Sequence, residues 1–286
     1  MEKYYRFAGI DLSVVLPEGM AFASEGALGP FAVDAVTQPH RFICSIVDTL
    51  IPPEGECIYN GGGFRVYRDG ETQLRYVGSV QKDWRSAYMR VINRGREHRI
   101  ELKKDACAGC ISAKAVLTAM AVEHLTAQAG SFVFHSSFIE WKGRAILFTA
   151  PSGTGKSTQA ELWRSLRDAR IINGDRSAVL AEENSITAFG IPFSGSSPYC
   201  ENRSLPLAAI VYLEQAPVTA IRRLRGSEAF ARIWEGISVN VWDREDVSLV
   251  SDTVLQTVRQ VPVYHLACTP DESAVYALEN LLERQV

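Results

Sequence analysis

The stretch of sequence that decides the fold is Ala150-Pro151-Ser152-Gly153-Thr154-Gly155-Lys156-Ser157-Thr158. It follows a nearly all-apolar run, Ala145–Phe148, and it opens a segment, Ser157–Leu166, whose apolar spacing predicts a helix. A glycine-rich turn between a buried strand and a helix binds anions, because its backbone N–H groups and the positive end of the helix dipole converge on one point. The sequence therefore predicts a loop that binds the phosphates of a nucleotide, and ATP with Mg²⁺ is the ligand we expect.

The positions of this loop have distinct expected roles. The loop keeps the pattern G-x-x-x-x-G-K-[S/T] except at its first position, which is Ala150. Lys156 is expected to bridge the β- and γ-phosphates, and the hydroxyl of Ser157 is expected to bind Mg²⁺. The residues predicted to bind the nucleotide are Ser152, Gly153, Thr154, Gly155, Lys156, Ser157 and Thr158.

The composition of the whole chain makes some classes of partner less favourable. The 286 residues carry a net charge of −3, which provides no general attraction for nucleic acid or for an anionic membrane. Because no apolar run approaches the ~20 residues needed to span a bilayer, we expect a cytoplasmic protein. A typical domain size of about 150 residues predicts one large domain or two medium-sized ones.

Six cysteines are spread along the chain. In a reducing compartment most of them should be free thiols. Cys107 and Cys110 have the C-x-x-C spacing of half a zinc site or of a redox dithiol. Because a structural zinc needs four ligands and no second pair follows, we favour two unpaired thiols at the start of a helix.

The periodicity of the sequence changes near residue 105. Residues 1–104 consist mainly of short runs that predict strands, separated by turn signals such as Asp69-Gly70. From residue 105 onward, predicted helices and strands are mixed. We therefore expect a β-rich domain at 1–104 and a nucleotide-binding α/β domain at 105–286, α+β overall. The predicted strands are Tyr4–Ala8, Ile10–Leu16, Arg41–Val47, Phe64–Tyr67, Gln73–Val77, Trp84–Val91, His98–Leu102, Ser131–Glu140, Arg144–Ala150, Ile171–Ile172, Ala178–Ala181, Ala188–Ile191, Leu207–Leu213, Ala220–Leu224 and Val261–Cys268. The predicted helices are Ile111–Ala127, Ser157–Leu166, Ser227–Gly236, Val247–Arg259 and Asp271–Glu283.

Two residues outside the loop connect it with a known family. His135 lies on the predicted strand about fifteen residues before the loop, and Asp175 follows the loop after one short helix. With these features, Val133–Val179 resembles the catalytic core of the HPr kinase/phosphorylase family, a relative of phosphoenolpyruvate carboxykinase. The resemblance implies a carboxykinase-like P-loop kinase core. Together with the β-rich first part, the chain is similar in character to the HPr-kinase-like proteins of peptide-modification clusters.

The resemblance also implies roles for individual residues. Asp175 is the expected general base or metal-binding residue, and His135 is expected to contact the γ-phosphate or to orient Asp175. Arg203 is expected to clamp the transferring phosphate, and Glu201 to bind metal together with Ser157 and Asp175. The family has two adjacent acidic residues at the second motif, whereas this sequence has Gly174 in the first of the two places.

These features lead us to expect a kinase that transfers the γ-phosphate of ATP to a hydroxyl of a peptide, a protein or a small molecule. Two alternatives stay open. The chain could be a nucleotide-binding regulatory or scaffold protein without phosphotransfer, as Gly174 would allow. It could also be a carboxykinase-type enzyme, although no clear basic constellation for a dicarboxylate is found. HPr itself is a poor candidate for the acceptor, and the hexamers of HPr kinases make a homo-oligomer conceivable.

Overall fold

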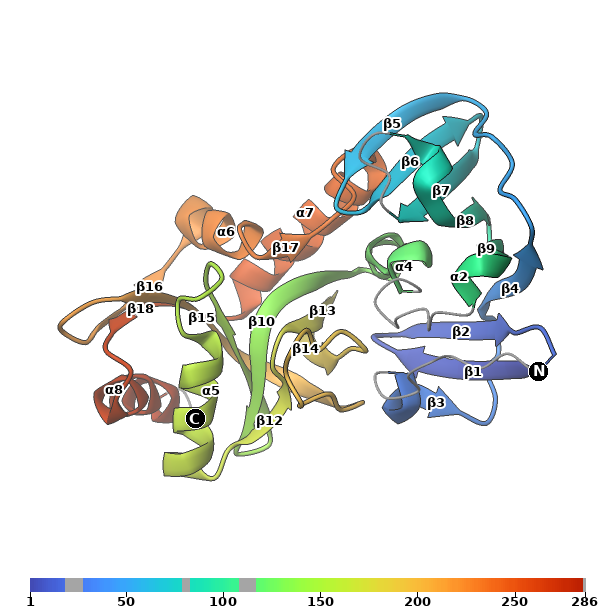
Figure 1. The fold of residues 1–286 in the computed structure, drawn as a ribbon. Helices are drawn as coiled ribbons and strands as arrows, with labels where there is room; N and C mark the ends of the chain where they lie inside the picture. Colours follow the sequence, from blue (N-terminus) through green and yellow to red (C-terminus); the bar gives the residue numbers. More distant parts are fainter. Residues whose placement is uncertain (19–27, 79–82, 108–116, 285–286) are drawn as a thin grey trace. The chain divides into compact units, whose positions relative to one another are not determined.

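The chain folds into two compact units, Met1–Val122 and Glu123–Val286. The computed structural model in Figure 1 describes residues 1–18, 28–78, 83–107 and 117–284. Both units contain a β-sheet, and the second adds several helices, so the mixed α/β class is confirmed. The division lies downstream of the one expected after residue 104.

The first unit is a nine-stranded sheet in the order β3-β1-β2-β4-β9-β8-β7-β6-β5. Its strands pair antiparallel except for β4, which runs parallel to both β2 and β9. The turn at Asp69-Gly70 joins β6 to β7, and Gly70 adopts the φ of +56° that such a hairpin requires, as predicted. The strands are β1 (Glu2–Phe7), β2 (Ile10–Val15), β3 (Ala32–Val33), β4 (His40–Val47), β5 (Glu56–Gly61), β6 (Phe64–Asp69), β7 (Thr72–Gly78), β8 (Ala87–Arg94) and β9 (Glu97–Lys103), followed by the short helix α2 (Lys104–Cys107).

The second unit is built around two long strands, each of which pairs with more than two other strands. Strand β10 (Ser131–Trp141) pairs with β13 along its first half and with β11 along its second half. Strand β15 (Ser204–Gln215) begins beside β14 and continues between β11 and β18. The other strands are β11 (Arg144–Thr149), β12 (Arg170–Asn173), β13 (Arg176–Glu182), β14 (Ser185–Gly190), β16 (Ala220–Leu224), β17 (Ile237–Ser238) and β18 (Val263–Cys268).

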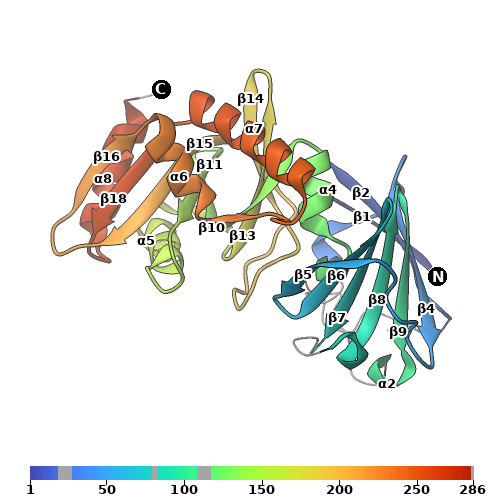
Figure 2. The same cartoon turned by 90° about the horizontal axis from the view of Figure 1, so that it is seen from above.

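Helices cover both faces of the β11–β15–β18 part of this sheet. Helices α5 (Lys156–Arg167) and α8 (Glu272–Glu283) share one apolar core with β11 and β18. Helices α6 (Gly226–Trp234) and α7 (Arg244–Gln260) share another core with β10, β13 and β15. In Figure 1 the two pairs lie on opposite sides of β15 and β18, and Figure 2 shows α7 beside α6. This arrangement explains why Ala145–Phe148, on the strand before the glycine loop, is apolar, since the strand is covered on both faces.

The parallel strands β11, β15 and β18 end at the same edge of the sheet. Loops that follow such ends are where ligands bind in open α/β sheets. The glycine loop follows β11, Ala216-Pro217 follows β15, and Thr269-Pro270 follows β18. The topology therefore brings three loops together at one edge of the sheet.

Some local predictions were wrong. The predicted helix Ile111–Ala127 is interrupted, because Ala121 has a φ of +55° and α4 (Val122–Gln128) begins only after it. Residues 111–116 of that prediction lie outside the described residues. The predicted strand Trp84–Val91 starts with a 3₁₀ turn at Trp84–Ser86, where the side chain of Asp83 accepts a hydrogen bond from the backbone N–H of Arg85. Strand β5 was not predicted at all.

Candidate functional site

The glycine loop joins the end of β11 at Thr149 to the start of α5 at Lys156. Gly153 has a φ of +81° and Gly155 a φ of +119°, backbone conformations that residues with a Cβ rarely adopt. A Cβ built on either glycine would meet no other atom within 4 Å, so the inner side of the loop faces open space. Helix α5 has no side-chain cap, because its N-cap is Gly155. Its first N–H groups are therefore directed toward this space.

Lys156 lies at the first position of α5 and is largely buried, with 8% of the residue exposed. Its ammonium group donates to the backbone oxygens of Ala150 at 2.9 Å and of Pro151 at 3.3 Å. An ammonium group has three protons, so one remains for a further acceptor. Burial lowers the pKa of Lys156, and the negative charge of Asp175 opposes this shift.

Asp175 is held by a turn at the end of β12. The side-chain oxygen of Asn173 accepts hydrogen bonds from the backbone N–H groups of Asp175 and Arg176, at 2.9 and 3.0 Å. The side-chain nitrogen of Asn173, which is fully buried, donates to the backbone oxygen of Ile191. One amide side chain thus fixes both the turn that carries Asp175 and the start of the loop that follows β14.

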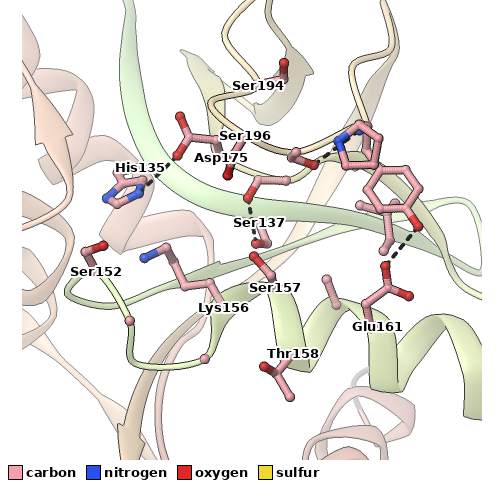
Figure 3. A pocket seen from close by; sticks show the side chains of 18 residues that line it. His135, Ser137, Ser152, Lys156, Ser157, Thr158, Glu161, Asp175, Ser194 and Ser196 are labelled. Atoms are coloured by element: carbon pink, nitrogen blue, oxygen red, sulfur yellow. Dashed lines mark hydrogen bonds and ion pairs between the residues drawn. The ribbon is translucent and has the colours of Figure 1, made fainter.

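His135 lies on β10, at the point where this strand passes from β13 to β11. Its backbone N–H donates to Gly236, and its backbone oxygen accepts from the hydroxyl of Thr149 at the end of β11. These bonds leave the imidazole directed at Asp175, with 3.4 Å between His135 Nε2 and Asp175 Oδ1 (Figure 3).

The hydrogen bond from His135 lowers the pKa of Asp175 below its ordinary value of 3.8. Burial opposes the shift, and the positive charges of Arg176 and Lys156 add to it. Asp175 is consequently ionised at neutral pH and is a hydrogen-bond acceptor on both oxygens.

The loop, Lys156, His135 and Asp175 line one cavity of about 500 Å³. In the view of Figure 3, Ser152, Lys156, Ser157 and Thr158 lie on one side of this cavity and Asp175 lies on the other. We refer to it as the carboxylate cavity. Its full lining is His135, Ser137, Ser152, Gly153, Gly155, Lys156, Ser157, Thr158, Ala160, Glu161, Ile171, Gly174, Asp175, Ser194, Ser196, Ser197, Pro198 and Tyr199.

A second cavity, of about 620 Å³, lies against the same loop and shares Gly153, Gly155 and Thr158 with the first. Its other walls come from the ends of β15 and β18 and from the loops after them. The residues outside the glycine loop and α5 that line it are Leu213, Glu214, Gln215, Ala216, Pro217, Cys268, Thr269 and Pro270. We refer to it as the strand-end cavity.

The structure brings most of the predicted site residues together, but not all of them. Ser152, Gly153, Gly155, Lys156, Ser157, Thr158, His135 and Asp175 line the carboxylate cavity, and Thr154 lines the strand-end cavity. Arg203 lines neither of these two cavities; its guanidinium binds Glu140 on β10 at 2.6 Å. Glu201 also lies outside both, in an ion pair with Arg170 at 2.9 Å. These two residues follow the bridge of Cys200 to Asn173, and their side chains pair with strand residues instead of facing the loop.

Several residues that line the carboxylate cavity were not predicted to belong to the site. Ser137 and Glu161 lie on elements that were predicted correctly, but neither matched a motif. The segment Ser194–Tyr199 forms the remaining wall, and Tyr199 donates to Glu161 on α5 at 2.9 Å. A signal was present in the chain, because three serines within four positions follow a strand that ends beside the second acidic motif.

Within the described residues, no group of three or more histidine, cysteine, aspartate or glutamate side chains could hold a metal ion. The four cysteines that the structure describes, Cys44, Cys57, Cys200 and Cys268, are free thiols. Burial raises the pKa of Cys44 to about 12 and that of Cys200 to about 11, so both stay protonated at neutral pH. Cys110 and the side chain of Cys107 lie outside the described part. No helix within the described residues is long and apolar enough to cross a membrane.

Comparison with known proteins places the chain in a family. The family model described as SynChlorMet cassette protein ScmC matches residues 100–282, which is more than half of the chain. The chain belongs to this family. The match to the ScmC model covers the glycine loop, His135, Asp175 and the strand-end cavity.

Among solved structures, the Hpr(Ser) kinase/phosphatase from Coxiella burnetii is similar to this chain with a TM-score of 0.31 and 11% sequence identity. The similarity covers 54% of this chain and 95% of that one. No curated protein sequence matches the chain.

Proposed function

We propose that this ScmC-family chain is an ATP- and Mg²⁺-dependent phosphotransferase that transfers the γ-phosphate to a hydroxyl of a peptide, a protein or a small molecule. One observation carries the proposal. An ionised carboxylate, Asp175, lies in the same cavity as a helix-opening glycine loop and its buried lysine, Lys156. Phosphoryl transfer to a hydroxyl needs an anion site, a cation at the phosphates and a base near the acceptor.

The fit of the loop to a triphosphate rests on its open inner side. Gly153 and Gly155 leave room for close approach, and the N–H groups at the start of α5 supply donors. Lys156 has one proton beyond the two that bind the loop carbonyls. The strand-end cavity, which shares the loop, has the neutral and apolar groups of Leu213, Gln215 and Pro217 to receive the nucleoside.

The fit to Mg²⁺ rests on the small number of protein ligands that this ion needs. Mg²⁺ bound to nucleotides keeps several waters and takes one or two protein ligands in addition to phosphate oxygens. Ser157 and Asp175 line the same cavity, and both supply oxygen. These two residues would hold the ion, which supplies neutralisation of phosphate charge when bound. Because Glu201 is paired with Arg170 outside the cavity, we leave it out of the proposed metal site.

The roles of the chain's own residues follow from this arrangement. Lys156 holds the phosphates and reduces their negative charge, and the loop N–H groups fix their position. Asp175 accepts the proton of the acceptor hydroxyl, and the low pKa of this carboxylate keeps it ionised for that purpose. His135 orients the Asp175 carboxylate through its hydrogen bond. The acceptor hydroxyl enters from the side of the cavity formed by Ser194–Tyr199.

A second function, nucleotide binding without transfer, is favoured by the surroundings of Gly174. A Cβ at this position would lie 2.0 Å from the hydroxyl of Ser197, so the packing leaves no room for a second carboxylate beside Asp175. A carboxykinase activity has less support. Among the residues that line the carboxylate cavity, the cationic side chains are Lys156 and, when protonated, His135. These two side chains carry little positive charge to bind the two carboxylates of a dicarboxylate substrate.

The first experiment is a calorimetric titration of the full-length chain with ATP in the presence of Mg²⁺. We expect saturable binding that Lys156→Ala weakens by about 100-fold, since the lysine makes charge-assisted hydrogen bonds to phosphate. Lys142→Ala is the matched control, because this lysine is exposed and pairs with Glu283 far from the loop. Equal affinity in wild type and Lys156→Ala contradicts a loop-centred site.

The second experiment separates transfer from binding. The chain is incubated with γ-labelled ATP, Mg²⁺ and candidate peptides encoded beside its gene, and labelled products are separated from nucleotide. Transfer to a hydroxyl that depends on Asp175 and Lys156 supports the kinase. Saturable ATP binding without any loss of the γ-phosphate, in all acceptors tested, supports the binding-only alternative.

A further inference from the structure

The loop between β14 and β15 brings three serines to the carboxylate cavity, and their hydroxyl groups take no part in the proposed transfer to an external acceptor. Ser194, Ser196 and Ser197 all line the cavity that contains Lys156 and Asp175. In Figure 3, Ser194 and Ser196 lie on the Asp175 side, opposite Ser152 and Thr158. Their hydroxyl groups are of the same chemical class as the proposed acceptor.

The loop that carries these serines is tied at both of its ends. At its base, Asn173 bridges to Cys200 and donates to the backbone oxygen of Ile191. Near its far end, Tyr199 donates to Glu161 on α5. Between these points, the backbone N–H of Ser197 donates to the backbone oxygen of Ser194 at 2.8 Å, which closes a tight turn. The turn is therefore held over the cavity by the same helix that carries Lys156 and by the strand end that carries Asp175.

This turn contacts Asp175, the proposed general base. Gly195 has a φ of +57°, and a Cβ built on it would lie 2.8 Å from the carboxylate carbon of Asp175. Only glycine allows so close an approach without displacing the carboxylate. Ser194 and Ser196 lie on either side of Gly195 in the sequence, so the turn that contacts Asp175 carries both of them into the cavity that Asp175 lines.

The three serines differ in how their hydroxyls are engaged. The Ser197 hydroxyl accepts from the backbone N–H of Tyr199 at 3.2 Å and packs on the backbone of Gly174. The Ser194 hydroxyl interacts with the thiol of Cys200. Ser196 is exposed, and among the described residues its side chain has no hydrogen-bond partner. Ser196 is thus the serine whose hydroxyl is available for a reaction.

We infer that the chain phosphorylates itself in cis on Ser196. The inference rests on the proposed phosphotransferase function and names an acceptor for the same site. The Ser196 oxygen forms a bond to the γ-phosphorus, and the bond from that phosphorus to the oxygen bridging to the β-phosphate breaks. The hydroxyl proton passes to the Asp175 carboxylate, and a nucleoside diphosphate leaves. Because the acceptor is held on the same unit as the loop, the step is intramolecular and gains from a high effective concentration.

The modification also has a consequence for the site. A phosphoserine adds about two negative charges and three strong acceptor oxygens. At position 196 this group lies in the cavity that receives the γ-phosphate, and it competes for Lys156 and the loop N–H groups. We therefore expect the phosphorylated chain to bind ATP about tenfold more weakly than the unmodified chain.

The test is mass spectrometry of the full-length chain after incubation with ATP and Mg²⁺, with fragmentation to locate the phosphoryl group. We expect one phosphoryl group per wild-type chain, on Ser196, and none on Lys156→Ala. Ser196→Ala should lose the modification, and Ser196→Thr, which restores a hydroxyl, should carry it at position 196. The matched control is Ser185→Ala, an exposed serine on β14 outside both cavities, which should be modified like the wild type.

Two further measurements separate the possible outcomes. Mixing wild type with Lys156→Ala should leave the latter unmodified, whereas modification of the inactive chain overturns the cis step. Titration of phosphorylated and unphosphorylated chain with ATP tests the expected loss of affinity without relying on turnover. If the wild type binds ATP and releases its γ-phosphate while Ser196 stays unmodified, this inference is wrong and the proposed function stands. If the wild type does not bind ATP, both are wrong.

Discussion

Each of the two units contains nine strands. Among the described residues, however, the candidate site lies in the second unit. In the first unit most neighbouring strands are joined as antiparallel pairs, so the strand ends alternate between the two edges of the sheet. In the second unit β11, β15 and β18 run parallel and end at one edge. A sheet with parallel strands brings loops that are distant in sequence to one place, and the candidate site lies there.

The two units also differ in the contacts that their buried polar side chains make. In the second unit, buried polar side chains such as Asn173 fix the turn beside Asp175 and the base of the serine-bearing loop. In the first unit, the buried His98 stacks on Phe42 at 4.3 Å. In this chain the candidate site lies where parallel strands end at one edge of the sheet. The buried amide of Asn173 fixes the turns beside that edge. The following predictions test this difference.

The largest expected effect is on transfer in Asp175→Asn. The amide cannot accept the acceptor's proton, so we expect the rate of γ-phosphate transfer to fall by about 10²- to 10⁴-fold. Binding of ATP should weaken far less than transfer, because the loop, Lys156 and Ser157 are intact and the introduced amide still offers an oxygen to Mg²⁺. Labelled transfer and calorimetric binding are measured on the same preparation, with the exposed Asp252→Asn on α7 as the control. Parallel losses of binding and transfer would show that Asp175 serves the nucleotide and not the acceptor.

The next effect is on stability, and it separates the two units. Trp163 on α5 is fully buried and packs on Trp141 at 5.1 Å, so Trp163→Ala should cost about 3–5 kcal/mol. Phe42→Ala, at a fully buried position of the first unit, should cost a similar amount. Hydrogen exchange followed by mass spectrometry locates the loss of protection. We expect each substitution to affect its own unit, and uniform loss across the chain in both variants contradicts separate units.

A smaller effect is expected for Gly174→Ala. The added Cβ would lie 2.0 Å from the Ser197 hydroxyl, so the turn or the serine must move, at about 1–3 kcal/mol. Gly29→Ala in the first unit is the matched control, because a Cβ there meets no other atom within 4 Å. Denaturant unfolding measures both. Similar midpoints for the two variants would mean that the packing of Ser197 on Gly174 has no energetic importance.

The smallest expected effect is on the ionisation of Asp175. Because the hydrogen bond from His135 lowers the pKa of this carboxyl, His135→Gln should raise it toward 3.8. The lowered pKa stabilises the folded chain above the unfolded-state value, and this contribution is lost as the pH falls through the folded-state pKa. The variant should therefore lose a little stability near neutral pH and show a shallower decline below about pH 4. Carboxyl NMR titration measures the pKa, with His265→Gln, which pairs with Glu214, as the control.

Much of the second unit could be predicted from the sequence. The glycine loop, the strand before it and the helix after it have local signatures, and Ala220–Leu224 was predicted to the residue. His135 and Asp175 were selected because of their spacing from the loop, and the structure places both in its cavity. The helices and strands around the loop could be predicted because they depend on short segments whose geometry the residues themselves determine.

The remaining features depend on contacts between distant segments. Arg203 and Glu201 were selected from a local resemblance, but their partners, Glu140 and Arg170, lie on strands that only the fold brings near. The serine-bearing wall of the cavity depends on the bond from Asn173 to Ile191, which no periodicity reveals. The interruption at Ala121 follows from a backbone conformation that alanine rarely adopts, and the helical spacing around it gave no sign of the break.

The central claim is that the nucleotide binds at the strand ends of the second unit, with its terminal phosphate toward Asp175. Hydrogen exchange of the full-length chain with and without ATP and Mg²⁺ tests it most directly, because the exchange is read along the whole sequence. We predict slower exchange in peptides that cover residues 150–158 and 173–176, absent in Lys156→Ala, and unchanged exchange in β1–β9. Protection confined to the first unit, or protection at the loop that persists in Lys156→Ala, would contradict the account.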